Sequence, residues 1–209
     1  MSNTSLLFQC LLGIRCNDFT MIAADQTNTQ GVLIMKDDDD RLLELADKIV
    51  LGVNGTTGDM VQFTQFIAKN LRLYEMRNKY GLDSRAVVHF TRKIMADGLR
   101  DGNPCLLNVL MAGYDDELGS QLYSMDFLAS CVSVPFAVHG LGGFLSLSII
   151  DNYYKPTLTE IEAYDVIKMC VSEIQSRLFL NLSNFGVKSV TKWGVKTLPT
   201  INPSTFTSK

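Results

Sequence analysis

The first hundred positions show two kinds of hydrophobic pattern. Short apolar runs bounded by turn residues predict strands over residues 6–14, 19–24 and 49–53. Over residues 60–74 the apolar positions instead recur every three or four residues, which predicts a long helix that ends at Gly81. A second helix is predicted to begin at Asp83 or Ser84, either of which fits an N-cap, and to fray around residues 98–102.

The strand pattern returns in the second half of the chain. Strands are predicted over residues 106–112, 121–127 and 131–138, and the first of these is apolar enough to be buried on both faces. A glycine-rich turn at residues 140–143 opens a helix that Pro156 ends. Thr159, with Glu162 three positions later, forms the pattern of a capping box at the start of another helix. Alternating residues over 186–198, with Trp193 and Gly194 at the centre, predict a terminal hairpin.

This order of elements indicates the fold class. The helices come in sequential pairs and do not alternate singly with strands, which disfavours a doubly wound parallel sheet. Two packed sheets with a helix layer on each side would satisfy every buried face, so an α+β fold with four layers is predicted. No linker or repeat divides residues 1–209, and a single domain is expected. The polar tail from about residue 199 is expected to be loosely held.

Composition and net charge argue against some classes of binding partner. The 209 residues are 46% hydrophobic, enough for a substantial core, and carry a formal net charge of -3. This balance argues against nucleic acid or an anionic membrane as the principal partner. The five cysteines are scattered without the spacing of a zinc site, so neither structural metal nor disulfides are expected. They are Cys10, Cys16, Cys105, Cys131 and Cys170.

One segment has the length of a membrane span. Residues 127–150 contain no Asp, Glu, Lys or Arg, but Pro135 and three glycines make a continuous lipid-facing helix improbable. The N-terminal apolar run lacks a preceding basic region and is interrupted by Gln9 and Gly13, so it makes a poor signal peptide. A chain that stays outside both the membrane and the secretory route is expected.

Candidate catalytic and ligand-binding residues are few. His89 and His139 lack neighbouring residues of a triad or metal motif, and both are interpreted as packing or surface residues. The turn at residues 140–143 lacks the third glycine of a dinucleotide fingerprint and the lysine of a P-loop. The acidic run at residues 37–40 lacks the spacing of a calcium loop and is interpreted as a solvated hairpin tip. No cofactor is expected.

Several segments together nevertheless resemble a known family. The strand that ends at Asp25 in Ala-Ala-Asp is followed by Asn54-Gly55, with Asp59 opening the first long helix. Residues 111–115 (MAGYD), 121–126 (QLYSMD) and the Gly140 turn complete a pattern that covers nearly the whole chain. The chain resembles the beta-type subunits of the 20S proteasome. The resemblance implies an αββα sandwich of the N-terminal-nucleophile hydrolase type.

The resemblance also assigns the family's catalytic positions. Active members use a threonine that processing exposes as the first residue, so that its hydroxyl attacks while its own α-amine takes the proton. In those members an Asp lies sixteen residues after the threonine and a Lys sixteen residues after the Asp. Counting from Asp25 places Gln9 at the nucleophile position and Arg41 at the lysine position. A carboxamide cannot attack, and a guanidinium does not lose its proton near neutral pH.

The remaining family positions also lack catalytic groups. The resemblance places Leu141 where active members have a serine, and Asn181 and Asn184 where they have an Asp and a Ser. Of the site, only Asp25 keeps its residue type, and a structural role in the turn after its strand is expected. Further segments resemble the non-catalytic branch of the family; they are residues 35–38, 73–78, 112–116, 151–156 and 180–182.

A non-catalytic, structural subunit is therefore expected. Its implied partners are other beta subunits in a seven-membered ring, alpha subunits and the opposite beta ring, in the cytoplasm and nucleus. One alternative is an active N-terminal-nucleophile peptidase that uses Cys10, Ser5 or Thr4 after processing. Another is a free-standing binding module, which would be monomeric.

Overall fold

The computed structural model describes residues 8–30 and 33–207, which form two five-stranded antiparallel sheets and a small hairpin. The first sheet has the order β10 (Phe136–His139), β1 (Leu11–Arg15), β2 (Phe19–Asp25), β11 (Phe185–Thr191), β12 (Gly194–Ile201). The second sheet has the order β5 (Leu42–Ala46), β6 (Ile49–Gly55), β7 (Leu107–Asp115), β8 (Gly119–Met125), β9 (Cys131–Ser133). The separate hairpin pairs β3 (Asn28–Gln30) with β4 (Leu33–Lys36).

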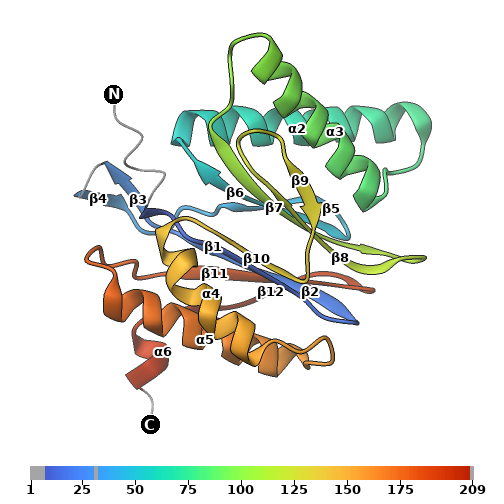
Figure 1. The fold of residues 1–209 in the computed structure, drawn as a ribbon. Coiled ribbons are helices and arrows are strands. Elements are labelled where there is room, and N and C mark those ends of the chain that lie inside the picture. The colour runs from blue at the N-terminus through green and yellow to red at the C-terminus, as the bar shows by residue number, and fades with distance from the viewer. Residues whose placement is uncertain (1–7, 31–32, 208–209) are drawn as a thin grey trace.

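Helices cover the outer face of each sheet (Figure 1). α2 (Thr57–Asn78) and α3 (Ser84–Arg100) lie on the second sheet, and α4 (Leu141–Tyr153) and α5 (Glu160–Arg177) lie on the first. The short α6 (Ser204–Thr207) follows β12. The layers run helix, sheet, sheet, helix, which confirms the predicted four-layer αββα sandwich of the α+β class.

The two sheets pack directly against each other. Their inner faces share a cluster of buried apolar side chains, made up of Leu11, Ile22, Ala24, Leu42, Val50, Leu110, Ala112, Leu122 and Val190. All seven residues of β2 are buried, because one face meets the opposite sheet and the other meets α5. In β7, five consecutive residues from Val109 to Gly113 are buried, as the uninterrupted apolar run predicts.

Two of the predicted helix starts are confirmed. Asp83 caps α3 by accepting the backbone N–H of Ala86 at 2.8 Å. Thr159 and Glu162 form the predicted capping box at the start of α5. The predicted end of α2 at Gly81 is wrong by two residues: Lys79 takes the left-handed conformation, with φ at 66°, and its N–H bonds to the carbonyl of Glu75 at 2.8 Å.

The predicted single strand over residues 131–138 is wrong. The segment divides at Pro135 into β9, which pairs with β8 in the second sheet, and β10, which pairs with β1 in the first. Proline has no N–H to continue a ladder, so the chain leaves one sheet and enters the other at this point. The hydrophobic periodicity is the same on both sides of Pro135, so it could not show that the chain crosses from one sheet to the other there.

Three further differences concern residues 28–46 and the tail. β3, β4 and β5 are not among the predicted strands, because apolar and polar residues do not alternate clearly in them; every residue of β4 is exposed although three of its four residues are apolar. The acidic residues 37–40 connect β4 to β5 and are not the tip of a hairpin. The tail is also more ordered than expected, because β12 continues to Ile201, whose side chain is fully buried opposite Phe185. Pairing of β12 with β11 and the hydrogen bond from the hydroxyl of Tyr164 to the carbonyl of Pro199, 2.8 Å long, also hold this end on the sheet.

The apolar segment 127–150 is divided among β9, β10 and part of α4. Within residues 8–30 and 33–207, no helix combines the length and apolar character that crossing a membrane requires.

His139, at the end of β10, gives the fold a testable pH dependence. Burial lowers the pKa of this imidazole, whose Nε2 lies 3.1 Å from the hydroxyl of Ser124. The unfolded chain, with a pKa of about 6.5, therefore binds a proton more readily than the folded chain does. Stability is retained above that value, and as pH falls below it His139 contributes a loss of up to about 1.4 kcal/mol per pH unit.

Urea unfolding between pH 7 and pH 5 measures this loss. We expect His139→Gln to have a shallower decline in the free energy of unfolding than the parent chain. The other histidine, the exposed His89 on α3, supplies the matched control, and His89→Gln should keep the parent slope. Equal slopes for the two variants would contradict the assignment to His139.

Candidate functional site

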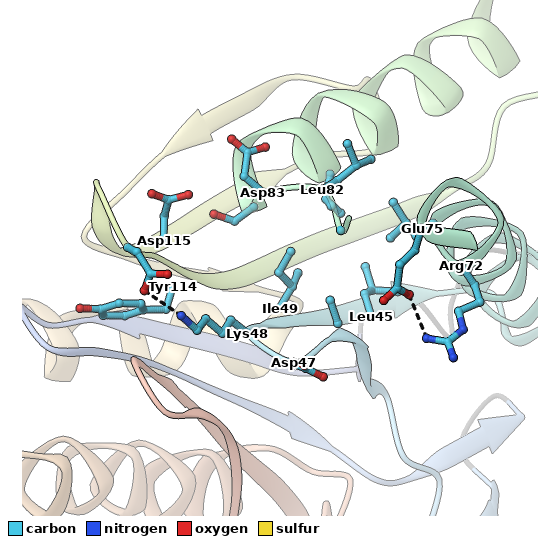
Figure 2. A pocket seen from close by; sticks show the side chains of 16 residues that line it. Leu45, Asp47, Lys48, Ile49, Arg72, Glu75, Leu82, Asp83, Tyr114 and Asp115 are labelled. Atoms are coloured by element: carbon cyan, nitrogen blue, oxygen red, sulfur yellow. Dashed lines mark hydrogen bonds and ion pairs between the residues drawn. The ribbon is translucent and has the colours of Figure 1, made fainter. Parts of the chain in front are cut away.

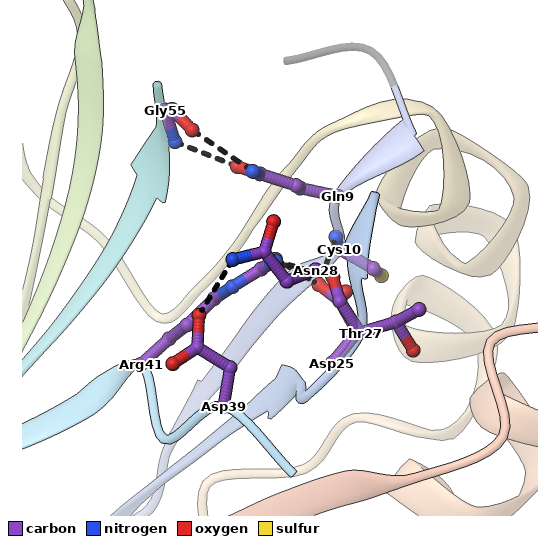
Figure 3. A network of polar contacts seen from close by, with 8 residues as sticks. All are labelled: Gln9, Cys10, Asp25, Thr27, Asn28, Asp39, Arg41 and Gly55. Carbon is purple, nitrogen blue, oxygen red and sulfur yellow. Dashed lines mark hydrogen bonds and ion pairs between the residues drawn. The ribbon is translucent and has the colours of Figure 1, made fainter. Parts of the chain in front are cut away.

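Antiparallel pairing brings residues 9–10 and Asp25 together. Leu11 lies opposite Ala24 in the register of β1 and β2, so the residue before β1 meets the end of β2. The backbone N–H of Cys10 donates to Oδ1 of Asp25 at 2.7 Å, and the N–H of Asp25 donates to the carbonyl of Cys10 at 3.0 Å (Figure 3). The carboxylate is thus fixed by the backbone of the segment that carries Gln9.

Arg41 approaches the same carboxylate from the start of the second sheet. Its Nη1 lies 2.8 Å from Oδ1 of Asp25, and its Nη2 donates to the carbonyl of Thr27 (Figure 3). The two charged side chains are only 3% and 1% exposed. Burial raises the pKa of Asp25, while the charge of Arg41 and the N–H groups of Cys10 and Thr27 act in the opposite direction. A buried, paired Arg and Asp therefore join the two sheets.

Gln9 is held by a second set of bonds. Its Nε2 donates to the carbonyl of Gly55 at 2.9 Å, and its Oε1 accepts the N–H of Gly55 at 2.7 Å. The two bonds close a ring between the carboxamide and the end of β6, and they fix which end of the amide carries oxygen (Figure 3). Gln9 is 5% exposed. Its side chain is thus an additional cross-link between the sheets.

The turn before α4 closes tightly over this residue. Gly140 has a φ of 81°, and a Cβ at that position would lie 1.6 Å from the carbonyl oxygen of Gln9. Only glycine combines the positive φ with this close approach. Leu141 then begins α4 and is 38% exposed, so an apolar side chain without a hydroxyl stands beside the turn.

Asn181 and Asn184 lie in the segment between α5 and β11. Asn181 is exposed, whereas Asn184 donates its amide to the carbonyl of Asp37 at 3.0 Å. The carbonyl of Asn184 accepts the N–H of Gln26, the residue after Asp25, at 2.9 Å. Asn184 therefore supports the turn that follows β2. The assignment of six residues to the family's catalytic positions stays a prediction; they are Gln9, Asp25, Arg41, Leu141, Asn181 and Asn184.

Sequence reasoning selected the side chains of this network but missed their backbone partners. Gly55 is part of the Asn54-Gly55 segment that resembles the family, but no sequence pattern predicts that its backbone binds Gln9. The carbonyl of Thr27 has no sequence signature, because every residue carries one. Only the three-dimensional approach of β6 and of the turn after β2 reveals these two acceptors.

The thiol of Cys10 is enclosed. Cys10 is 1% exposed, and a Cβ on Gly142 would lie 3.0 Å from its sulfur. Burial first, and the charge of Asp25 second, raise the pKa of the Cys10 thiol well above its ordinary value. The thiolate that nucleophilic attack requires is thereby disfavoured. Thr4 and Ser5 lie outside the described residues.

A separate groove of about 470 Å³ lies where the end of α2 and the start of α3 meet the β5–β6 turn (Figure 2). Its two cations are already paired: Lys48 lies 2.7 Å from Asp116, and Arg72 lies 2.9 Å from Glu75. The groove does not include Gln9, Asp25 or Arg41. In the described part of the chain, no group of three or more His, Cys, Asp and Glu residues is arranged to hold a metal ion.

Comparison with known proteins identifies the family. The family model described as "Proteasome subunit" matches residues 9–190, and the chain belongs to this family. Its relatives include beta-type subunits. The chain is 39% identical to proteasome subunit beta type-2 of Oryza sativa subsp. japonica over 188 residues, which is 90% of this chain and 88% of the relative. It is 35% identical to proteasome subunit beta type-4 of Saccharomyces cerevisiae over 187 residues, 89% of this chain and 94% of the relative. The predicted resemblance to beta-type subunits is confirmed.

Proposed function

We propose that this chain is a non-catalytic beta subunit of the 20S proteasome core, of the kind called beta type-2. Its function is to occupy one position in a seven-membered beta ring that encloses the proteolytic chamber. The observation that carries the proposal is the hydrogen bonding of the Gln9 side chain. The residue at the nucleophile position has a carboxamide whose oxygen and nitrogen both bind the backbone of Gly55.

No group in this network replaces the nucleophile and the proton acceptor that the family's chemistry requires. Attack on a peptide needs a nucleophile and a group that accepts its proton, and in this family one N-terminal residue supplies both. Active members free this nitrogen by cleavage after a glycine, whereas Phe8 precedes Gln9 in this chain. Arg41 pairs with Asp25, and a guanidinium does not act as a base near neutral pH. These features support an architectural role for the network.

The proposed partners follow from the proposed ring. Seven different subunits in one ring need head-to-tail interfaces, in which each subunit presents two unlike surfaces to its neighbours. The other beta subunits, the alpha subunits and the opposite beta ring are the partners of this proposal, and the cytoplasm and nucleus are its proposed locations. The beta-type names of the relatives support it.

Covalent labelling of purified particles tests this function. We expect an inhibitor that bonds both the hydroxyl and the free α-amine of an N-terminal threonine to label the catalytic neighbours and leave this chain unlabelled. Intact-mass measurement should show that the mature chain keeps the residues ahead of Gln9. As a control, Gln9→Thr should also remain unlabelled, because the glycine after which active members cleave would still be missing, and Leu141 and Asn181 would be unchanged. A chain processed and labelled at Thr4, Ser5 or Cys10 would instead establish the peptidase.

A further inference from the structure

An open groove of about 510 Å³ lies between α3 and the loop that joins β8 to β9. Its apolar lining is formed by Ala96, Leu99, Leu128 and Ala129. Leu128 is 59% exposed, whereas Ala129 is 4% exposed and belongs to the core under α3. The groove therefore has an apolar lining that solvent reaches from one side, far in the chain from the network around Gln9.

The rest of the lining is basic. Arg92, Lys93 and Arg100 line the groove together with His89, and all four are exposed. α3 carries four arginine and lysine residues but only one carboxylate, Asp97, although the whole chain has a net charge of -3. Positive charge is thus concentrated on one helix of an acidic protein, beside an apolar surface.

The local contacts leave much of this charge available. Arg92 uses Nε to bond the carbonyl of Ala129 at 3.1 Å, which is one of the five N–H groups of a guanidinium. Arg100 pairs with Asp97 at 2.9 Å, but both side chains are largely exposed and such a pair is weak. The nearby carboxylate of Asp126 is occupied within its own loop, where it accepts the N–H groups of Leu128 and Ser130.

We propose that this groove binds an acidic segment of another subunit of the same particle. An apolar side chain of that segment lies on Leu99 and Leu128, and flanking Asp or Glu residues pair with Arg92 and Lys93. Charge complementarity selects this occupant, since a carboxylate–arginine pair supplies both charge and directed hydrogen bonds. The apolar lining favours a peptide over a bare phosphate chain, because only a peptide brings an apolar side chain between its charges. The proposal rests on the proposed function, which places the chain inside an assembly.

Photo-cross-linking in whole particles identifies the occupant. The probe is p-benzoylphenylalanine in place of Leu128, in particles purified from cells that express the full chain. We expect a cross-linked peptide from another proteasome subunit with at least two carboxylates close to the attachment point. Cross-linking to a peptide without acidic residues, to nucleic acid or to nothing in assembled particles would overturn the groove proposal. Absence of the chain from every particle, in the parent as well as the variant, would instead contradict the proposed function.

Charge reversal provides a second test. When co-expressed with the parent chain, Arg92→Glu with Lys93→Glu should enter particles at least about tenfold less, a difference that corresponds to about 1.4 kcal/mol. A remote reversal of two exposed lysines, Lys155→Glu with Lys192→Glu, should assemble normally. Equal incorporation of the parent and the groove reversal, or an equal loss in both reversals, would overturn the proposal.

Discussion

Replacing Arg41 by methionine is expected to lower the free energy of unfolding by about 3–5 kcal/mol. The reason is the charge that remains. Asp25 is 0% exposed and shares Oδ1 between Nη1 of Arg41 and the N–H of Cys10. Without the guanidinium, the carboxylate is buried with no compensating cation, and the carbonyl of Thr27 loses its donor as well. Urea unfolding of the purified chain, followed by circular dichroism, measures the loss.

Two comparisons separate this effect from the loss of any arginine. Arg100→Met removes an exposed pair with Asp97 and should change stability by no more than about 0.5 kcal/mol. Combining Arg41→Met with Asp25→Asn should recover part of the loss, because the uncompensated charge is then gone. The coupling between Arg41 and Asp25 would be refuted by a double variant whose loss equals the sum of the two single losses.

Substituting alanine for Gly140 is expected to cost at least about 3 kcal/mol, of which roughly 1–3 kcal/mol comes from the positive-φ backbone alone. The remainder of the loss comes from a steric collision. A Cβ at Gly140 would lie 1.6 Å from the carbonyl oxygen of Gln9, so the turn and the segment before β1 must move apart. The hydrogen-bonded ring formed by Gln9 and Gly55 would be disturbed by the same movement.

Gly119 offers the matched control. It has a similar φ, 74°, but nothing lies within 4 Å of the position its Cβ would take. Gly119→Ala should therefore show the backbone cost without the collision, and thermal unfolding of both variants gives the difference. Similar losses at the two glycines would mean that the turn before α4 is free to move away from Gln9.

Much of the layer order could be predicted from local patterns. The stripe from Met60 to Leu71 and the cap at Asp83 are local features, and both predicted their helices correctly. The crossing at Pro135 could not be predicted, because strands of either sheet carry the same apolar signal and their partners lie far away in the chain. The end of α2 at Lys79 was missed because a left-handed lysine has no pattern that distinguishes it from a helical one.

The candidate site could likewise be predicted only in part. A fixed spacing around Asp25 was enough to select Gln9 and Arg41, and the structure places all three in one bonded network. What the selected residues do there depends on burial and on backbone acceptors from other strands. Gln9 bonds to Gly55 from 46 positions away in the chain, a contact that no local pattern encodes.

The crossing of the chain between the two sheets has a consequence for folding. β1 pairs with β10, and β2 pairs with β11, so the first sheet joins the beginning of the chain to segments that are synthesised much later. During translation the hairpin of β1 and β2 can form early, but both of its edges stay open until residues 136–139 and 185–191 have left the ribosome. Contacts of such long sequence separation slow folding and leave apolar edges accessible to other chains. The newly made subunit therefore depends on protection from aggregation until its last strands arrive.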